Sequence, residues 1–223
     1  GLPQRPFISV HLPIHDEPPE LVIRTLAALA ALDWDCYEVI VLDNNTPSVR
    51  TWGPVARLVA TLGPRFLFFH VEGLPGAKAG ALNLARMLTD SRADLIAVID
   101  ADYRVDSRFL RRAAAELTPD LAFVQFPQAY RTETQPAAGV ALEATEYFAL
   151  CPRHANAADA ALLTGTLLVI RTFALDAVGG WSARTVTEDA ELGLRLCAAG
   201  LSGRLHARGP SRGHAAHERP GRR

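Results

Sequence analysis

The sequence predicts an α/β protein with a mostly parallel central sheet and helices on both faces. Apolar runs of strand length alternate with segments of helical periodicity along most of the chain, which is typical of such a sheet. The 223 residues suffice for a single core, and 49% hydrophobic against 21% charged residues excludes a disordered chain. We therefore expect one soluble folded domain over residues 1–200.

Six apolar runs have the length of β-strands: Phe7–Leu12, Glu38–Leu42, Phe66–Val71, Leu95–Ile99, Leu121–Phe126 and Leu167–Arg171. The segments that alternate with them have a helical pattern. They are Pro19–Leu32, Val49–Leu62, Ala77–Leu88, Arg108–Leu117, Ala138–Leu150 and Glu188–Ala199. The first helical segment begins with Pro-Pro-Glu, which is typical of a helix N-terminus.

The charge balance and the apolar runs narrow the class of partner. A formal net charge of −1 provides no field for holding nucleic acid by its phosphates, so we expect no nucleic-acid partner. No apolar run reaches the ~18 to 20 residues that a membrane span requires. The three cysteines, Cys36, Cys151 and Cys197, are far apart and include no C-x-x-C pair. We expect reduced, buried thiols in a cytoplasmic protein.

The composition changes after Gly200. Six arginines against one acid give the segment Gly200–Arg223 a charge of +5, so the remainder of the chain carries −6. Glycine and proline are frequent in this segment and apolar residues are scarce, so it cannot bury a face. We predict a disordered basic tail over residues 201–223, either a solvated terminus or a contact for anionic lipid or nucleic acid.

Two predicted strands end in carboxylates. Asp43 is followed by two asparagines, and Asp100-Ala-Asp102 follows the strand Leu95–Ile99. Open parallel sheets bind ligands at the carboxyl ends of their strands. In extended geometry, both acids of the Asp-x-Asp pair project to the same side, where they suit Mg²⁺ or Mn²⁺ bound to a diphosphate. The alternative is a helix cap or a turn.

Lys78 is the only lysine among the 23 basic residues. It lies in a glycine-rich loop that follows a strand and opens a helix, a place that presents backbone N–H groups to an anion. The loop is no Walker A motif, because Lys78 is preceded by Ala77 and followed by Ala79. We favour a diphosphate contact over a surface lysine.

A third acidic group, Glu188 and Asp189, follows Thr187 at the start of the last predicted helix. Thr187 can cap this helix, and acids in a first helical turn are favoured by the helix dipole. The pattern alone therefore leaves a structural and a functional role equally open.

The order of these motifs resembles a glycosyltransferase family 2 domain of the cellulose synthase-like branch, from about Phe7 to Gly200. The motifs are Pro13-Ile-His-Asp-Glu17, Asp43-Asn-Asn, Lys78-Ala-Gly-Ala-Leu-Asn83, Asp100-Ala-Asp102, Val124-Gln-Phe-Pro-Gln128, Gly165-Thr, Gly179-Gly-Trp181 and Thr187-Glu-Asp189. The resemblance implies the Rossmann-like GT-A fold. It also implies β-linked transfer of a hexose from UDP-glucose or a similar donor to a growing β-glucan or other glycan acceptor.

The resemblance assigns roles residue by residue. The catalytic positions are Asp189, as general base, and its neighbour Glu188. Asp100 and Asp102 would hold Mg²⁺ or Mn²⁺. The positions assigned to the nucleotide sugar are Pro13, Glu17, Asp43, Lys78, Asp100, Gln125 and Gln128. His15 and Asp16 replace the Tyr-Asn usual in the first motif. A single displacement with one base would invert the anomeric carbon, and no second acid is available for a covalent intermediate.

The sequence departs from the branch at its end. The Gln-x-x-Arg-Trp acceptor motif is absent, and so are the transmembrane helices that usually follow it. We interpret the tail as truncated or frameshifted, and expect the full-length protein to be membrane-associated at the cytoplasmic face of the inner membrane. The alternative function is a catalytically inactive nucleotide-sugar-binding fragment. A nucleotidyltransferase is disfavoured, because Pro13–Glu17 is no triphosphate-binding glycine loop.

Overall fold

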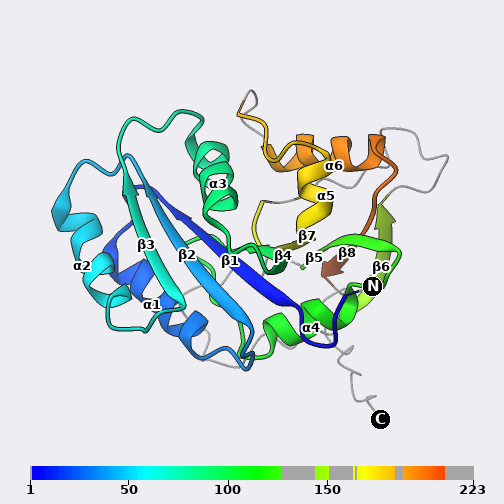
Figure 1. Cartoon of the computed structure of the whole chain (residues 1–223), viewed down its shortest axis with the longest axis horizontal. Coiled ribbons are helices and arrows are strands. Elements are labelled where there is room, and N and C mark those ends of the chain that lie inside the picture. Colours follow the sequence, from blue (N-terminus) through cyan, green and yellow to red (C-terminus); the bar gives the residue numbers. More distant parts are fainter. Residues whose placement is uncertain (1, 127–143, 151–162, 164, 184–187, 209–223) are drawn as a thin grey trace, which may run out of the picture.

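The computed structural model describes residues 2–126, 144–150, 163, 165–183 and 188–208, with only the backbone for 144–150 and 206–208. In these residues one eight-stranded sheet has the order β3-β2-β1-β4-β7-β5-β8-β6 (Figure 1). The strands are β1 (Phe7–Ile14), β2 (Tyr37–Asn44), β3 (Phe66–Val71), β4 (Ala93–Val98), β5 (Leu121–Gln125), β6 (Ala144–Leu150), β7 (Leu168–Arg171) and β8 (Ser202–Arg208). Strands β6 and β7 run against the others, so the predicted mostly parallel sheet is confirmed.

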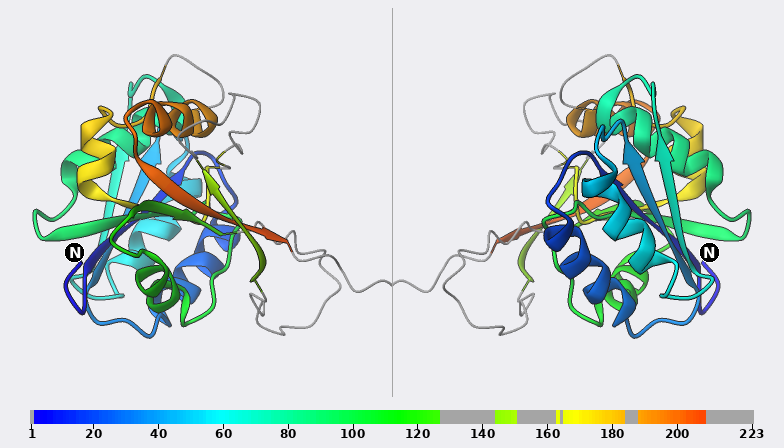
Figure 2. Two further views of the ribbon diagram at one scale, coloured as in Figure 1. Left: turned by 90° about the vertical axis from the view of Figure 1, so that its right-hand side faces the viewer. Right: turned by 90° about the vertical axis from the view of Figure 1, so that its left-hand side faces the viewer.

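Helices cover both faces of the sheet, as the two side views in Figure 2 show. One face is covered by α1 (Pro19–Ala30), α2 (Val49–Val59) and α4 (Phe109–Glu116), and the other by α3 (Ala77–Leu88), α5 (Thr172–Ala177) and α6 (Glu188–Ala198). Successive side chains of a strand alternate between the faces. In β1, Ile8, Val10 and Leu12 belong to the core under α1, whereas His11 faces α3.

The predicted elements agree with the structure up to β5, with shifts of a few residues at their ends. Three differences follow β5, and the third is strand β8. The short helix α5 was not predicted, because its six residues are too few for a periodic pattern. The helix predicted over 138–150 is wrong where it is described, since Ala144–Leu150 is strand β6, antiparallel to β8. Thr, Tyr and Phe in this segment favour a strand once a partner is present. Residues 138–143 lie outside the described residues.

The prediction of a disordered tail over 201–223 is wrong for Ser202–Arg208, which forms strand β8. β8 lies between β5 and β6 and pairs with both. The segment packs on the core through Leu205, and Gly203 makes room for the buried ring of Phe123 on the neighbouring strand. Residues 209–223 lie outside the described residues.

The cysteine prediction requires a correction. Cys36 is a free, half-buried thiol, but Cys197 is disulfide-bonded, so the three cysteines are not all reduced. The sequence spacing could not predict a disulfide, because the fold determines which cysteines lie close enough to pair. Cys151 lies outside the described residues. Among the helices that the structure describes, none has the length and apolarity to cross a membrane.

His11 is a fully buried polar side chain in the middle of the sheet. Its Nε2 lies 2.8 Å from Thr89 Oγ1, and its Nδ1 has no hydrogen-bond partner among the described residues. Burial lowers the pKa of His11 to about 3, because an imidazolium would lose its hydration here. The folded protein therefore contains a neutral imidazole at ordinary pH.

Replacing Gly203 with valine tests whether β8 belongs to the folded core. A Cβ at this position would lie 2.1 Å from Cζ of Phe123, whose ring is fully buried. We expect the free energy of unfolding in urea to fall by about 1–3 kcal/mol. Ser202→Ala, in the same strand, is the control and should change it by less than about 0.5 kcal/mol. Equal stability of the two variants would show that β8 is not packed on β5.

The lowered pKa of His11 predicts that the folded protein loses stability as the pH falls. Below pH ~6.5 the unfolded chain binds a proton on His11 that the folded chain does not bind, so acid favours unfolding. The contribution of His11 is complete above that pH and falls by about 1.4 kcal/mol per unit until pH about 3. Urea denaturation at pH 7.5 and 5.0 should show a smaller loss in His11→Leu than in the wild type. An identical loss would contradict the buried neutral imidazole.

Candidate functional site

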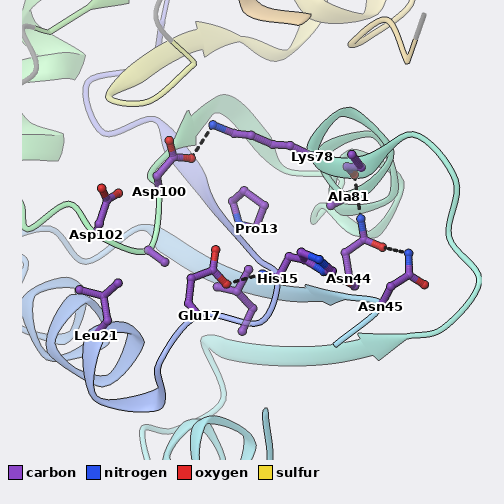
Figure 3. A pocket seen from close by; sticks show the side chains of 13 residues that line it. Pro13, His15, Glu17, Leu21, Asn44, Asn45, Lys78, Ala81, Asp100 and Asp102 are labelled. Atoms are coloured by element: carbon purple, nitrogen blue, oxygen red, sulfur yellow. Dashed lines mark hydrogen bonds and ion pairs between the residues drawn. The ribbon is translucent and has the colours of Figure 1, made fainter. Parts of the chain in front are cut away.

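A pocket of about 710 Å³ lies beyond the carboxyl ends of β1, β2 and β4 (Figure 3). Strand β1 has β2 on one side and β4 on the other, so the chain changes direction across the sheet at this point. Open α/β sheets bind ligands at such a switch point. The residues that line the pocket are Pro13, Ile14, His15, Glu17, Leu21, Asn44, Asn45, Ala77, Lys78, Ala81, Asp100, Ala101 and Asp102.

Lys78 and Asp100 face each other across one end of the pocket. Lys78 Nζ lies 2.6 Å from Asp100 Oδ1 and donates to the Gly165 carbonyl at 3.1 Å. Asp102, two residues further on, is exposed at the same end. Burial raises the pKa of Asp100, the charges of Asp102 and Glu188 raise it further, and Lys78 opposes the rise. One ammonium thus faces a surplus of carboxylates.

The carboxylates of Asp100 and Asp102 fit a divalent cation. They are hard oxygen donors, and the negative charge around Asp100 is incompletely balanced. The part of the chain that the structure describes holds no cluster of three or more His, Cys, Asp or Glu side chains suited to a metal. The two aspartates would therefore need further ligands from a bound anion and water, which is usual for Mg²⁺.

The loop before α3 is built so that backbone groups approach the pocket. Gly76 has a φ of 87°, and a Cβ on Gly80 would lie 1.9 Å from the Pro75 carbonyl oxygen. Asn44 Nδ2 donates to the Ala77 carbonyl at 2.8 Å. The Asn45 amide bonds Leu74 twice, donating to its carbonyl at 2.8 Å and accepting from its N–H at 3.1 Å. The end of β2 thereby fixes the start of α3.

The opposite end of the pocket is formed by the turn after β1. His15 Nδ1 lies 2.5 Å from the Asn44 carbonyl oxygen and donates to it, because a carbonyl can only accept. Glu17 accepts from the His15 backbone N–H. Burial raises the pKa of Glu17 and the charge of Asp43 adds to the increase, whereas hydrogen bonds from the backbone N–H groups of His15 and Glu17 oppose it. Asp16 adopts a φ of 56°, and its N–H donates to Thr46 Oγ1 at 2.9 Å.

Asp43 lies behind the pocket and does not line it. Its carboxylate is buried, lies 2.5 Å from His70 Nδ1 and accepts from Thr46 Oγ1. Trp52 stacks on His70 with ring centroids 4.4 Å apart. Because Asp43 is only 1% exposed, a direct contact with a ligand would require the residues that cover it to move.

Glu188 and Asp189 come to the site from the N-terminus of α6. A Cβ on Gly165 would lie 3.0 Å from Asp189 Oδ2 and 3.3 Å from Lys78 Nζ, so both charged groups border the same small space. Asp189 Oδ1 accepts from the N–H of Ala190 at 2.8 Å, which leaves Oδ2 toward Gly165. The carboxylate of Asp189 thus lies beside the Lys78 end of the pocket.

Gln125 is not at the pocket surface. It is 4% exposed, and its Nε2 donates to the carbonyls of Thr166 at 2.5 Å and Phe126 at 3.1 Å. Gln128 lies outside the described residues. Of the predicted site residues, the structure therefore gathers at the pocket Pro13, Glu17, Lys78, Asp100 and Asp102, with Glu188 and Asp189 beside them.

Sequence reasoning missed several lining residues, among them Asn44, Asn45 and Ala81. Asn44 and Asn45 could have been found, because they follow Asp43 at the end of a strand, where polar residues are expected to contact a ligand. Ala81 carries no signal, since its contribution is the small size that opens the pocket beside α3.

The sequence matches the model of Glycosyl transferase family group 2 over residues 95–218. This match continues past Gly200, where the resemblance was expected to fade. The chain is 30% identical over 201 residues to the beta-monoglucosyldiacylglycerol synthase of Synechocystis sp., covering 86% of this chain and 40% of that protein. It is 25% identical over 207 residues to the UDP-forming cellulose synthase 1 catalytic subunit of Komagataeibacter xylinus, covering 88% and 27%. The chain thus spans less than half the length of these relatives.

The fold matches that of the mannosyltransferase PcManGT from Pyrobaculum calidifontis, solved in complex with GDP-Man and Mn²⁺. The TM-score is 0.66 at 20% identity, and the match covers 94% of this chain and 59% of that one. The predicted GT-A fold is confirmed by this likeness.

Asn45 offers a test of how the glycine-rich loop is held. Asn45 has a φ of 60°, so Asn45→Gly keeps the backbone relaxed and loses the side-chain hydrogen bonds, two to Leu74 and one to Asn44 Oδ1 at 2.7 Å. We expect Asn45→Gly to lose about 1–3 kcal/mol of unfolding free energy. Asn45→Ala should lose about 1 kcal/mol more, because alanine disfavours positive φ. Urea titrations measure both, and stabilities ranked in the opposite order would contradict this description of the loop.

Proposed function

Since the chain belongs to glycosyltransferase family 2, we propose that it transfers a hexose from a nucleotide-sugar donor to a glycan acceptor with inversion of the anomeric carbon. The donor is UDP-glucose, and the acceptor is a growing β-glucan or another glycan. The observation that carries the proposal is the pairing of Lys78 with Asp100 in a pocket at the switch point of the sheet. This arrangement offers a cation and metal-ligating acids to a diphosphate.

The donor diphosphate is proposed to lie against the start of α3. Lys78 and the backbone N–H groups after Gly76 provide positive charge there. Pro13 and Glu17 line the other end, where we place the nucleoside. Asp43 supports this end indirectly, because its carboxylate holds Thr46, which in turn accepts from Asp16. Gln128, in the motif after β5, is assigned to the sugar by resemblance.

Asp189 is proposed as the general base. As the acceptor oxygen bonds to the anomeric carbon, the bond from that carbon to the diphosphate breaks and the acceptor proton moves to the Asp189 carboxylate. Lys78 stabilises the charge that develops on the departing diphosphate. Glu188 adds negative charge close to Asp100. A single displacement of this kind inverts the sugar, so an α-linked donor gives a β-linked product.

A divalent cation completes the proposal. Asp100 and Asp102 would hold Mg²⁺ or Mn²⁺, which supplies Lewis-acid stabilisation to the diphosphate when bound. The similar PcManGT structure contains Mn²⁺ together with its GDP-Man donor.

UDP-glucose is favoured by the names of the curated relatives. The Komagataeibacter relative is UDP-forming, and the Synechocystis relative is named for a monoglucosyl product. GDP-mannose is the competing donor, because PcManGT was solved with it. Both relatives are much longer than this chain, and we propose that the full-length protein holds the domain at the cytoplasmic face of the inner membrane.

The proposed activity is tested by measuring UDP release from UDP-glucose with Mn²⁺, with and without β-glucan oligosaccharides, and GDP release from GDP-mannose in parallel. We expect acceptor-dependent UDP release that EDTA abolishes. UDP binding without release from any donor and acceptor would favour the alternative, an inactive nucleotide-sugar-binding fragment. Release of GDP alone would overturn the donor assignment.

Replacing Asp189 with asparagine should separate catalysis from donor binding. The variant keeps the shape of the side chain and loses the base, so transfer should fall by about 100-fold or more. UDP affinity, measured by calorimetry with Mn²⁺, should change little. Glu191→Gln is the matched control, because it removes an acid from the same helix that pairs with Arg195 instead. Equal loss of UDP binding and transfer in Asp189→Asn would contradict the base assignment.

A further inference from the structure

The short segment Gly165–Leu167 is hydrogen-bonded to both Lys78 and Asp100, the charged pair at one end of the pocket. Gly165 and Leu167 both have positive φ, 54° and 57°. The segment is nevertheless fixed on both sides, because the Leu167 N–H donates to the Val98 carbonyl at 2.8 Å and its carbonyl accepts from Phe126 N–H at 3.0 Å. Non-glycine residues at positive φ persist where surrounding contacts hold them. The segment is therefore hydrogen-bonded both to β4 and to the residue that follows β5.

This segment bonds both members of the Lys78–Asp100 pair. The Asp100 backbone N–H donates to Thr166 Oγ1 at 3.0 Å, and Lys78 Nζ donates to the Gly165 carbonyl at 3.1 Å. Thr166 itself is fully buried and does not line the pocket. It therefore acts on the site through Asp100 and without touching a pocket ligand.

Gln125 holds the segment from the far side. Its Nε2 donates to the Thr166 carbonyl at 2.5 Å and to the Phe126 carbonyl at 3.1 Å, and the side chain is 4% exposed. Both donor hydrogens of the amide are thus directed at main-chain carbonyls, one in the segment Gly165–Leu167 and one at Phe126. A chain of contacts leads from Gln125 through Thr166 to Asp100.

Gly165 separates Lys78 from Asp189. A Cβ here would lie 3.0 Å from Asp189 Oδ2 and 3.3 Å from Lys78 Nζ, closer than most real Cβ contacts. Because glycine has no side chain, the proposed base Asp189 and Lys78, which is proposed to bind the diphosphate, can border the same space.

We propose that Gly165–Leu167 is the positioning element of the transfer site, with Thr166 and Gln125 as positioning residues and Gly165 as the position that keeps Asp189 beside Lys78. This inference rests on the proposed function. Gln125, assigned to the donor by resemblance, then acts through Thr166 and makes no donor contact.

The conservative pair Thr166→Val and Thr166→Ser tests the role of the hydroxyl. Valine has nearly the same shape but offers no acceptor to the Asp100 N–H, whereas serine keeps one. With UDP-glucose, Mn²⁺ and a β-glucan oligosaccharide, kcat of Thr166→Val should fall about 10-fold or more, because small displacements of reacting groups are costly. Its KM for UDP-glucose should stay within about threefold, and serine should restore kcat. Equal kcat for valine, serine and wild type overturns the proposal.

Amide hydrogen exchange provides a readout that needs no turnover. In the free protein, the Asp100 amide should exchange slowly in the wild type and Thr166→Ser, and measurably faster in Thr166→Val. If the wild type turns over no nucleotide sugar, the proposed function fails, and the exchange result still decides the positioning role. Unchanged protection of the Asp100 amide in Thr166→Val overturns it.

Gly165→Ala tests the space between Lys78 and Asp189. Gly179→Ala is a matched control, because Gly179 also has a positive φ, 79°, but a Cβ there meets nothing within 4 Å. The two variants should have similar melting temperatures, while only Gly165→Ala loses about 10-fold or more in kcat. Equal activity of the two variants contradicts the role of Gly165.

Discussion

The contact between Lys78 and Asp100 is the interaction on which the site depends. It joins the first turn of α3 to the end of β4, two elements on different sides of the pocket, at an Nζ to Oδ1 distance of 2.6 Å. Both side chains remain about 30% exposed, so a ligand can reach them. Because Gly165 and Thr166 bond the same two residues, three separate segments of the chain determine one position.

The compact charge of the Lys78 ammonium suits this position, although all other Lys or Arg residues of the chain are arginine. An ammonium is a compact point charge, whereas a guanidinium is a planar fork that needs more room. The space beside Lys78 is narrow, since a Cβ on Gly165 would lie only 3.3 Å from Lys78 Nζ. Asp100 pairs with this one ammonium, Asp189 borders the same space, and the charges of Asp102 and Glu188 act on Asp100. A divalent cation together with an anionic diphosphate would balance that charge.

The sequence was sufficient for the parallel half of the sheet and for the pocket acids. Buried strands such as β2 and β4 are continuous apolar runs, and polar residues after them mark the ligand-binding edge. It was insufficient where tertiary contacts decide. From the sequence, Gly203 in β8 suggests a loop, and only its contact with Phe123 shows why a strand needs glycine there. Gln125 suggests a ligand contact, but in the fold its amide donates to the Thr166 carbonyl. The pairing of Asp43 with His70 likewise depends on the register of β2 and β3.

Calorimetric binding of UDP in the presence of Mn²⁺ to the wild type and to Lys78→Met tests the central claim most directly. Arg86→Met is the control, because Arg86 is another cation of α3 that pairs with Asp176 outside the pocket. If Lys78 contacts the diphosphate, its loss removes a charge-assisted hydrogen bond, and affinity for UDP should fall about 10-fold or more while the control binds normally. Wild-type affinity in Lys78→Met would contradict the account.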